Sequence, residues 1–418
     1  VVNPATLTGF GAPGAMFVAT IFASAITTAL IGLIANIPYA SAPGLGLNNT
    51  AANILAGYTA YLVGLSPAGI IAVVLLSGII NVLITVTNIR KYIITAIPRT
   101  LQNAIGAGIG LFLAFIGLKG AGIIVADPAN IVGLGTLTSA SALLALIGIV
   151  ITLFLYIKKV PASVFIGLVV TAIIGVIFTS LGYGVGGEVI MPTLPTEFIS
   201  FSFDTTVLFG FASGFGELFA TNPVDLIMIL FSFLFFIFFD TTGTLVSLGK
   251  AAGFPEDETG EIEGIGKAFI GDATGALIGA ILGTSPQTAY VESSTGISVG
   301  GRTGLTAVFT GIFFLIAIVF SPIVLAFFTS PVTCAALVMV GILMMGQLKD
   351  VEWDSLVATS SVFATLIMMI LTYSITLGIA FGFVTFALAS VADGKAKEIH
   401  WLVWILVIIF AIYLFFGL

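Results

Sequence analysis

Long apolar runs, separated by short polar or glycine-rich stretches, follow one another along most of the chain. Runs near the length of about 20 residues that a helix needs to cross a bilayer lie at 15–37, 67–86, 101–118, 139–157, 162–181, 226–246, 305–328 and 332–345. The strands of a membrane barrel would instead alternate polar and apolar residues over about 10 positions. The pattern therefore predicts an all-α polytopic membrane protein.

One apolar stretch, 355–391, is too long for one ordinary crossing and has the polar triplet Thr372, Tyr373 and Ser374 near its middle. A broken span and a helical hairpin both fit this pattern. Lys395 follows the stretch, and a return to the basic side of the membrane favours the hairpin.

Composition agrees with a membrane protein and excludes several chemistries. The 418 residues are 59% hydrophobic and 7% charged, against about 25% charged residues in an average soluble domain. Cys334 is the single cysteine and His400 the single histidine of the chain. An intrachain disulfide and a thiolate metal cluster are therefore excluded, and we expect no metal and no cofactor.

Basic residues gather in alternate connections between the apolar runs. By the positive-inside rule the cytoplasmic connections are those that carry Arg90, Lys91, Arg99, Lys158, Lys159, Lys250, Lys267, Arg302 and Lys349. The connection at 184–223 contains acids and no basic residue. We therefore expect 184–223 to be an extracellular loop.

Two acids occur where an ionisable group is costly. Asp240 ends the apolar run 232–240, and Glu292 follows the stretch 283–290, which contains glycine and proline. A charged side chain at the centre of a membrane helix costs about 2.5 to 3.5 kcal/mol even on insertion scales. The two acids therefore indicate a binding site inside the bilayer.

A weak internal repeat surrounds this region. The segment TALIGLI at 28–34 is similar to GALIGAI at 275–281, and each runs into an extended, proline-containing stretch, at 38–44 and 284–290. If each copy holds an odd number of crossings, the copies are inverted. Paired interruptions in inverted halves point to a transporter's substrate site, because only a ligand or a polar cavity can satisfy the freed backbone groups.

Several motifs in order along the chain carry a family resemblance. They are APGLGLN at 42–48, FDTTGTL at 239–245, GD at 271–272, GTS at 283–285, YVESSTG at 290–296 and GGRTGLTA at 300–307. Together they resemble the AzgA-type adenine/guanine/hypoxanthine permeases of the nucleobase-cation symporter superfamily, which includes uracil and xanthine permeases.

The resemblance implies two inverted repeats of seven spans, with short half-strands at 39–43 and 284–290 before broken third and tenth spans. The family's first span would precede Val1 and so be absent from this chain. The core domain would comprise 1–87 and 224–330, and the gate domain 88–183 and 331–418, with the loop 184–223 between the repeats.

The resemblance also implies that Asp240 and Glu292 contact the substrate base and that Asn48 adds a polar contact. A purine presents ring N–H donors and ring acceptors. The carboxylates can accept from the donors, and backbone N–H groups can donate to the acceptors. We expect further substrate contacts from the side chains of Thr244 and Tyr290 and the backbone of Ala42, Gly44 and Val291.

Each of these residues has a plainer interpretation. Asp240 could form a hydrogen bond between two helices. Asn48 could be the N-cap of a helix, and the Thr244 hydroxyl could bond to the backbone of its own helix. Because burial disfavours the ionised form of a carboxyl, Asp240 and Glu292 are also the candidates for carrying a coupled proton.

The predicted protein is a secondary active transporter of the plasma membrane and not an enzyme. It would import adenine, guanine or hypoxanthine by proton symport, with alternating access between core and gate domains. Its partners would be a purine nucleobase, a proton and the lipid bilayer, with no nucleic acid, and a homodimer is left open. The alternatives are a sulfate-type anion carrier on the same architecture, an ion channel and an intramembrane aspartyl enzyme.

Overall fold

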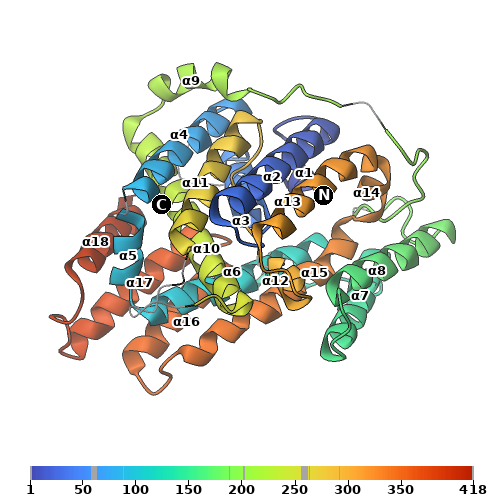
Figure 1. Ribbon diagram of the computed structural model, residues 1–418. Helices are drawn as coiled ribbons and strands as arrows, with labels where there is room; N and C mark the ends of the chain where they lie inside the picture. Colours follow the sequence, from blue (N-terminus) through green and yellow to red (C-terminus); the bar gives the residue numbers. More distant parts are fainter. Residues whose placement is uncertain are drawn as a thin grey trace. The chain divides into compact units, whose positions relative to one another are not determined.

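The computed structural model (Figure 1) describes residues 2–57, 64–87, 89–187, 189–200, 203–255, 262, 264–290 and 292–416. Within these residues eight helices are long and apolar enough to cross a membrane, and a bent helix pair makes up to nine. The all-α polytopic prediction is therefore confirmed.

The helices are α1 Val2–Thr6, α2 Pro13–Ala35, α3 Leu45–Leu55, α4 Pro67–Val86, α5 Ile89–Ala96, α6 Arg99–Gly120, α7 Ala140–Ile157, α8 Ser163–Ser180, α9 Phe211–Ala220, α10 Pro223–Ala252, α11 Ile265–Ile281, α12 Ser293–Ser298, α13 Gly304–Val319, α14 Ser321–Phe327, α15 Ser330–Met344, α16 Leu356–Leu371, α17 Ile375–Ala392 and α18 Trp401–Phe416. The strands are β1 Ser41–Pro43, β2 Ile124–Asp127, β3 Ile131–Leu134 and β4 Gln287–Ala289.

The chain forms two compact units. The first comprises residues 110–202 and 316–346 with the first two residues, and the second comprises 3–109, 203–315 and 347–418. In the first unit α7 packs against α8 and α15, and a Cβ on Gly148 would lie 2.8 Å from the Thr171 side chain. A small residue at this contact lets the two helices approach closely, as is common in membranes.

In the second unit α2, α4 and α10 pack against α11. The stretch 355–391 folds as a hairpin of α16 and α17, which pack against each other. Tyr373 takes a left-handed φ of 54° at the turn, and Ser374 Oγ accepts from Leu377 N at 3.3 Å to cap α17. The hairpin, and not a broken span, is therefore the outcome.

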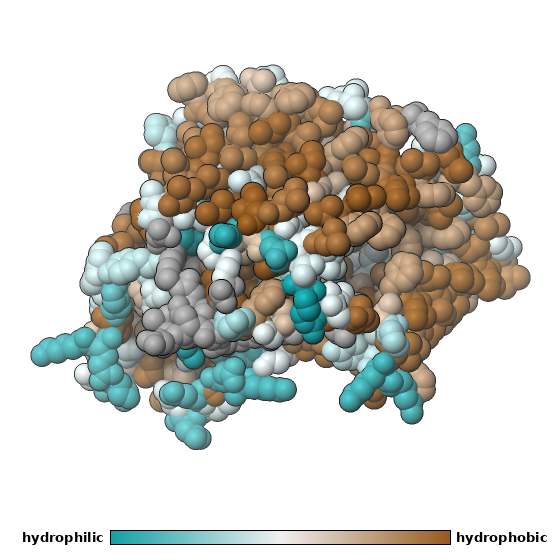
Figure 2. All heavy atoms as spheres, in the orientation of Figure 1, coloured by the Kyte–Doolittle hydropathy of each residue, from teal (hydrophilic) through white to brown (hydrophobic). Residues whose placement is uncertain are grey.

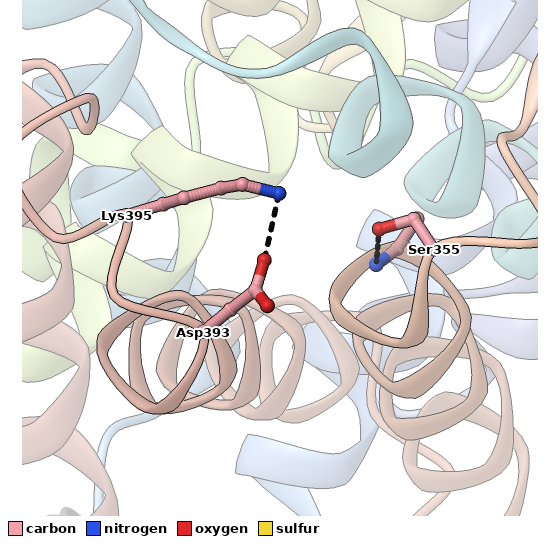
Figure 3. Close-up of polar contacts among 4 residues, drawn as sticks. Ser355, Asp393 and Lys395 are labelled. Atoms are coloured by element: carbon pink, nitrogen blue, oxygen red, sulfur yellow. Dashed lines mark hydrogen bonds and ion pairs between the residues drawn. The ribbon is translucent and has the colours of Figure 1, made fainter.

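The far ends of this hairpin carry further polar contacts (Figure 3). Ser355 Oγ accepts from Ala358 N at 3.4 Å and caps α16. Lys395 Nζ lies 2.7 Å from Asp393 Oδ2 in the turn after α17. Hydroxyl N-caps satisfy otherwise unpaired N–H groups at helix starts, so the Ser355 contact defines where α16 begins.

Two local features are seen only in the structure. The run 305–328 bends by 87° between α13 and α14, because Pro322 lacks an N–H and its ring clashes with the carbonyl four residues earlier. The segment 184–223 contains the helix α9. Glu217 of α9 accepts from the backbone N–H and the hydroxyl of Ser66 at 2.8 and 2.6 Å, which ties α9 to the start of α4.

Large apolar side chains lie on the surface of the protein. Hydrophobic residues cover much of the face shown in Figure 2. Phe219, Leu356 and Phe415 are 91%, 81% and 82% exposed. A soluble monomer rarely exposes large contiguous apolar patches, whereas lipid contact suits such a surface.

Candidate functional site

The two interruptions of the repeat meet as a two-stranded sheet. β1 pairs antiparallel with β4, and Ser41, Ala42 and Pro43 lie opposite Ala289, Thr288 and Gln287. The pairing continues at both ends, because Gly44 N donates to Pro286 O at 3.1 Å and Tyr290 N donates to Ala40 O at 2.9 Å. The predicted half-strands therefore exist, and they contact each other.

Side chains from two helices satisfy the outer edges of this small sheet. On the β1 edge, Thr28 of α2 accepts from Ser41 N and donates to Ser41 O, both at 2.9 Å. On the β4 edge, Asp272 Oδ1 of α11 accepts from Ala289 N at 2.8 Å. Buried backbone groups away from water need such partners. The repeat helices α2 and α11 thus hold the interrupted segments in place.

Asp240 of α10 lies beside the paired strands. Its Oδ2 accepts from the Thr288 hydroxyl at 3.2 Å, and a Cβ placed on Gly44 would lie 3.5 Å from the same oxygen. The Asp240 residue is half-buried. A carboxylate oxygen therefore lies next to both strands, in a position from which it can accept from a bound polar molecule.

Glu292 occupies the position that precedes α12, directly after the β4 segment. It is exposed and does not cap that helix with its side chain. Its carboxylate interacts electrostatically with Asp240 and with Tyr290. The fold therefore places the two acids, which lie far apart in the sequence, within electrostatic range of each other.

The remaining predicted side chains divide into two groups. Asn48 of α3 is fully buried, and within the described residues neither its amide nitrogen nor its amide oxygen has a hydrogen-bond partner. Thr244 is buried on α10, one turn beyond Asp240. The Tyr290 hydroxyl instead donates to Pro43 O, so in this structure it ties the strands together. A substrate contact by Asn48, Thr244 or Tyr290 stays a prediction.

The predicted backbone contacts fall on strand-pairing groups. Gly44 N already donates to Pro286 O at 3.1 Å. Ala42 lies two residues before Gly44 and opposite Thr288. Alternate pairs in an antiparallel sheet exchange hydrogen bonds, so Ala42 and Thr288 form such a pair. A substrate contact from either N–H group would have to replace one of these bonds. Val291 lies outside the described residues.

Thr288 is a residue of the candidate site that the sequence did not predict. Its side chain faces Asp240, whereas that of its neighbour Gln287 faces α2, where Gln287 Oε1 accepts from Ser24 Oγ at 3.0 Å. Successive side chains of a strand point to opposite faces. If Gln287 faces α2, its neighbour Thr288 must face the other side, where Asp240 of α10 lies. Within the described residues no cluster of His, Cys, Asp and Glu could hold a metal ion.

Comparison with known proteins identifies the family. A model described as the permease family, Xan_ur_permease, matches residues 1–415. The chain is 41% identical over 407 residues to the guanine/hypoxanthine permease PbuG of Bacillus subtilis, covering 96% of this chain and 87% of PbuG. It is 35% identical over 416 residues to the adenine permease AdeP of Escherichia coli, covering 99% of this chain and 88% of AdeP.

This chain belongs to the Xan_ur_permease family, and it is therefore a multi-pass membrane transporter and not an enzyme. Among solved structures, it is similar to the transmembrane domain of the cyanobacterial bicarbonate transporter BicA, with a TM-score of 0.57, 17% identity and coverage of 91% of this chain and 95% of that chain. That likeness concerns the fold alone, and it agrees with the predicted inverted seven-plus-seven repeat.

Proposed function

We propose that the chain is a secondary active transporter that imports purine nucleobases by proton symport, with Asp240 and Glu292 in the substrate site and access alternating between the core and gate domains. The observation that carries the proposal is the meeting of Asp240 with the β1–β4 pair through Thr288, in a chain that is 59% hydrophobic. The names of the relatives PbuG and AdeP support a purine as the substrate.

The chemistry of the site suits a neutral molecule that carries N–H donors. Asp240 and Glu292 can accept hydrogen bonds from the ring and amino N–H groups of a purine. The amide of Asn48 has no hydrogen-bond partner among the described residues, so its NH2 group can donate and its carbonyl oxygen can accept. A carboxyl that is neutral while its site is closed and ionised when the site opens to water can also carry a proton. Binding of the base and the proton at one site would therefore couple their movement.

An anion carrier is the second candidate, because BicA has the same fold. An anionic substrate would have to approach the carboxylates of Asp240 and Glu292. Like charges in a site of low dielectric repel strongly, so this arrangement favours a neutral base over an anion.

Uptake into proteoliposomes tests the proposal. Radiolabelled adenine, guanine, hypoxanthine, uracil and sulfate would be offered with and without a protonophore to the wild type and to the variants Asp240→Asn and Glu292→Gln. The exposed acids Asp354 and Glu197 provide the matched controls Asp354→Asn and Glu197→Gln. A hydrogen bond to a charged group contributes about 1.5 to 3 kcal/mol, so each site variant should lose about tenfold to 150-fold in uptake efficiency.

The outcomes separate the parts of the proposal. Purine uptake that the protonophore abolishes, and that the two site variants alone impair, supports it in full. Purine uptake that is the same with and without the protonophore would refute proton coupling but not purine transport. Sulfate uptake without purine uptake would establish the anion carrier, and uptake of no purine by correctly folded protein would refute the transport of these bases.

A further inference from the structure

A buried arginine lies in the short helix α5, at Arg90. The sequence pattern predicts that Arg90 lies in a cytoplasmic connection, but the residue is only 1% exposed. A guanidinium stays charged in proteins, and a buried charge is costly unless it is paired. The surroundings of Arg90 must therefore compensate its charge.

Arg90 contacts the two helices that carry Asp240 and Asp272. On α10 its Nη2 donates to Phe238 O at 3.3 Å, and its guanidinium carbon lies 5.4 Å from the centre of the Phe238 ring. On α11 the same carbon lies 4.3 Å from the centre of the Phe269 ring. Such cation–π contacts attract a cation, but they do not neutralise it.

The compensating charge comes from Asp272. Phe269 precedes Asp272 by three residues, so the α11 residue that the guanidinium contacts lies one helical turn before this acid, and the two charges lie within electrostatic range of each other. Asp272 is fully buried. Within the described residues Arg90 Nε and Nη1 have no hydrogen-bond partner, so this pairing rests on charge.

Asp272 is also the residue that holds β4, through the bond from Ala289 N at 2.8 Å. β4 in turn places Thr288 against Asp240 and leads into Glu292. A chain of contacts thus runs from Arg90 through Asp272 and the β4 backbone to the side chains of the candidate site.

We propose that Arg90 is a positioning residue of the substrate site, which places a positive charge beside the α11 turn that carries Asp272 and thereby helps this carboxylate to hold β4 and the two acids beside it. This inference rests on the proposed function. Arg90 itself touches no substrate. Its loss leaves Asp272 as an uncompensated buried charge, which either takes up a proton or turns away from Ala289, and in both cases the strand is held less well.

A double-mutant cycle tests the proposal. Arg90→Met keeps an unbranched apolar side chain and removes the charge. Asp272→Asn keeps a carbonyl oxygen that can accept from Ala289 N but needs no counter-charge. The KM and maximal rate of purine uptake, and purine binding by the purified protein, would be measured for the wild type, both single variants and the double variant. Arg99→Met, at the exposed start of α6, is the matched control.

We expect Arg90→Met to raise the KM and the Kd for the base about tenfold in the wild-type background, a size typical of coupled buried charges. In the Asp272→Asn background the same change should alter both constants less than about threefold. Arg90→Lys should recover part of the affinity. Arg99→Met should match the wild type. Because Arg90→Met leaves a buried charge uncompensated and lowers stability, the KM and the Kd are compared per folded molecule in all variants.

The inference is overturned if Arg90→Met leaves affinity unchanged, if its effect is equal in both Asp272 backgrounds, or if it lowers only the amount of folded protein. In these cases wild-type purine transport still stands. If the wild type neither binds nor transports a purine, the proposed function and this inference fall together. The two failures are therefore distinguishable.

Discussion

The contact between α11 and the segment leading into β4 allows a sharp test of how the site is held. Gly279 lies on α11 where a Cβ would be 2.2 Å from Ser285 O and 3.0 Å from Ser285 C. These are backbone atoms, so the clash cannot be relieved by a side-chain rotation. In the variant Gly279→Ala the segment that carries β4 must move away from α11.

The size of this displacement follows from the contact. A Cβ and a carbonyl oxygen need about 3.2 to 3.5 Å, so the strand must shift by about 1 Å. The bond from Thr288 to Asp240 is already 3.2 Å long and is lost at about 3.6 Å. Misplacement of a functional group by about 1 Å can cost about 100-fold in rate, and overpacking costs about 1 to 3 kcal/mol of stability.

Gly266→Ala is the matched control, because Gly266 lies on the same helix and a Cβ there would meet no atom within 4 Å. Purine uptake by proteoliposomes and thermal unfolding in detergent would be measured for both variants. We expect Gly279→Ala to lose at least tenfold in uptake efficiency and to unfold at a lower temperature. Gly266→Ala should transport normally and gain at most about 1 kcal/mol from helix propensity.

Normal uptake by Gly279→Ala, together with wild-type stability, would refute the reasoning. It would mean that the approach of α11 to Ser285 O is looser than the structure shows. A loss of stability with unchanged uptake per folded molecule would show that the packing is correct but that the position of β4 does not govern the site.

Three further predictions concern contacts around the site and at the protein surface. Thr28→Val should lower the free energy of unfolding by about 1 to 3 kcal/mol, because the backbone groups of β1 lose their partner, whereas Thr28→Ser should retain stability in the same thermal assay. Glu217→Ala should cost about 1 kcal/mol by removing the acceptor for Ser66 at the start of α4, and a melting temperature equal to that of the wild type would contradict this. Hydrogen bonds from the backbone N–H and hydroxyl of Thr206 hold the pKa of Asp204 below its ordinary value, so its small contribution to stability is present at neutral pH and is lost as the pH falls through the lowered pKa; Asp204→Asn should remove this part of the acid dependence of unfolding.

Local sequence patterns determined the class of this protein and the ingredients of its site. Apolar runs of membrane length predicted helical spans because a helix satisfies its own backbone in lipid. The cost of placing Asp240 and Glu292 among apolar residues predicted that they are functional. The interruptions at 38–44 and 284–290 were visible because proline and extended residues cannot continue a helix.

Only the tertiary structure decided how these ingredients are assembled. The register of β1 with β4 depends on contacts between residues almost 250 positions apart, which no local pattern contains. Thr288 became a partner of Asp240 only through that register. Arg90 looked like an ordinary loop base, yet packing against α10 and α11 buries it and places its guanidinium beside Phe238 and Phe269. Sequence records which residues are costly to bury, whereas long-range packing determines which of them compensate one another.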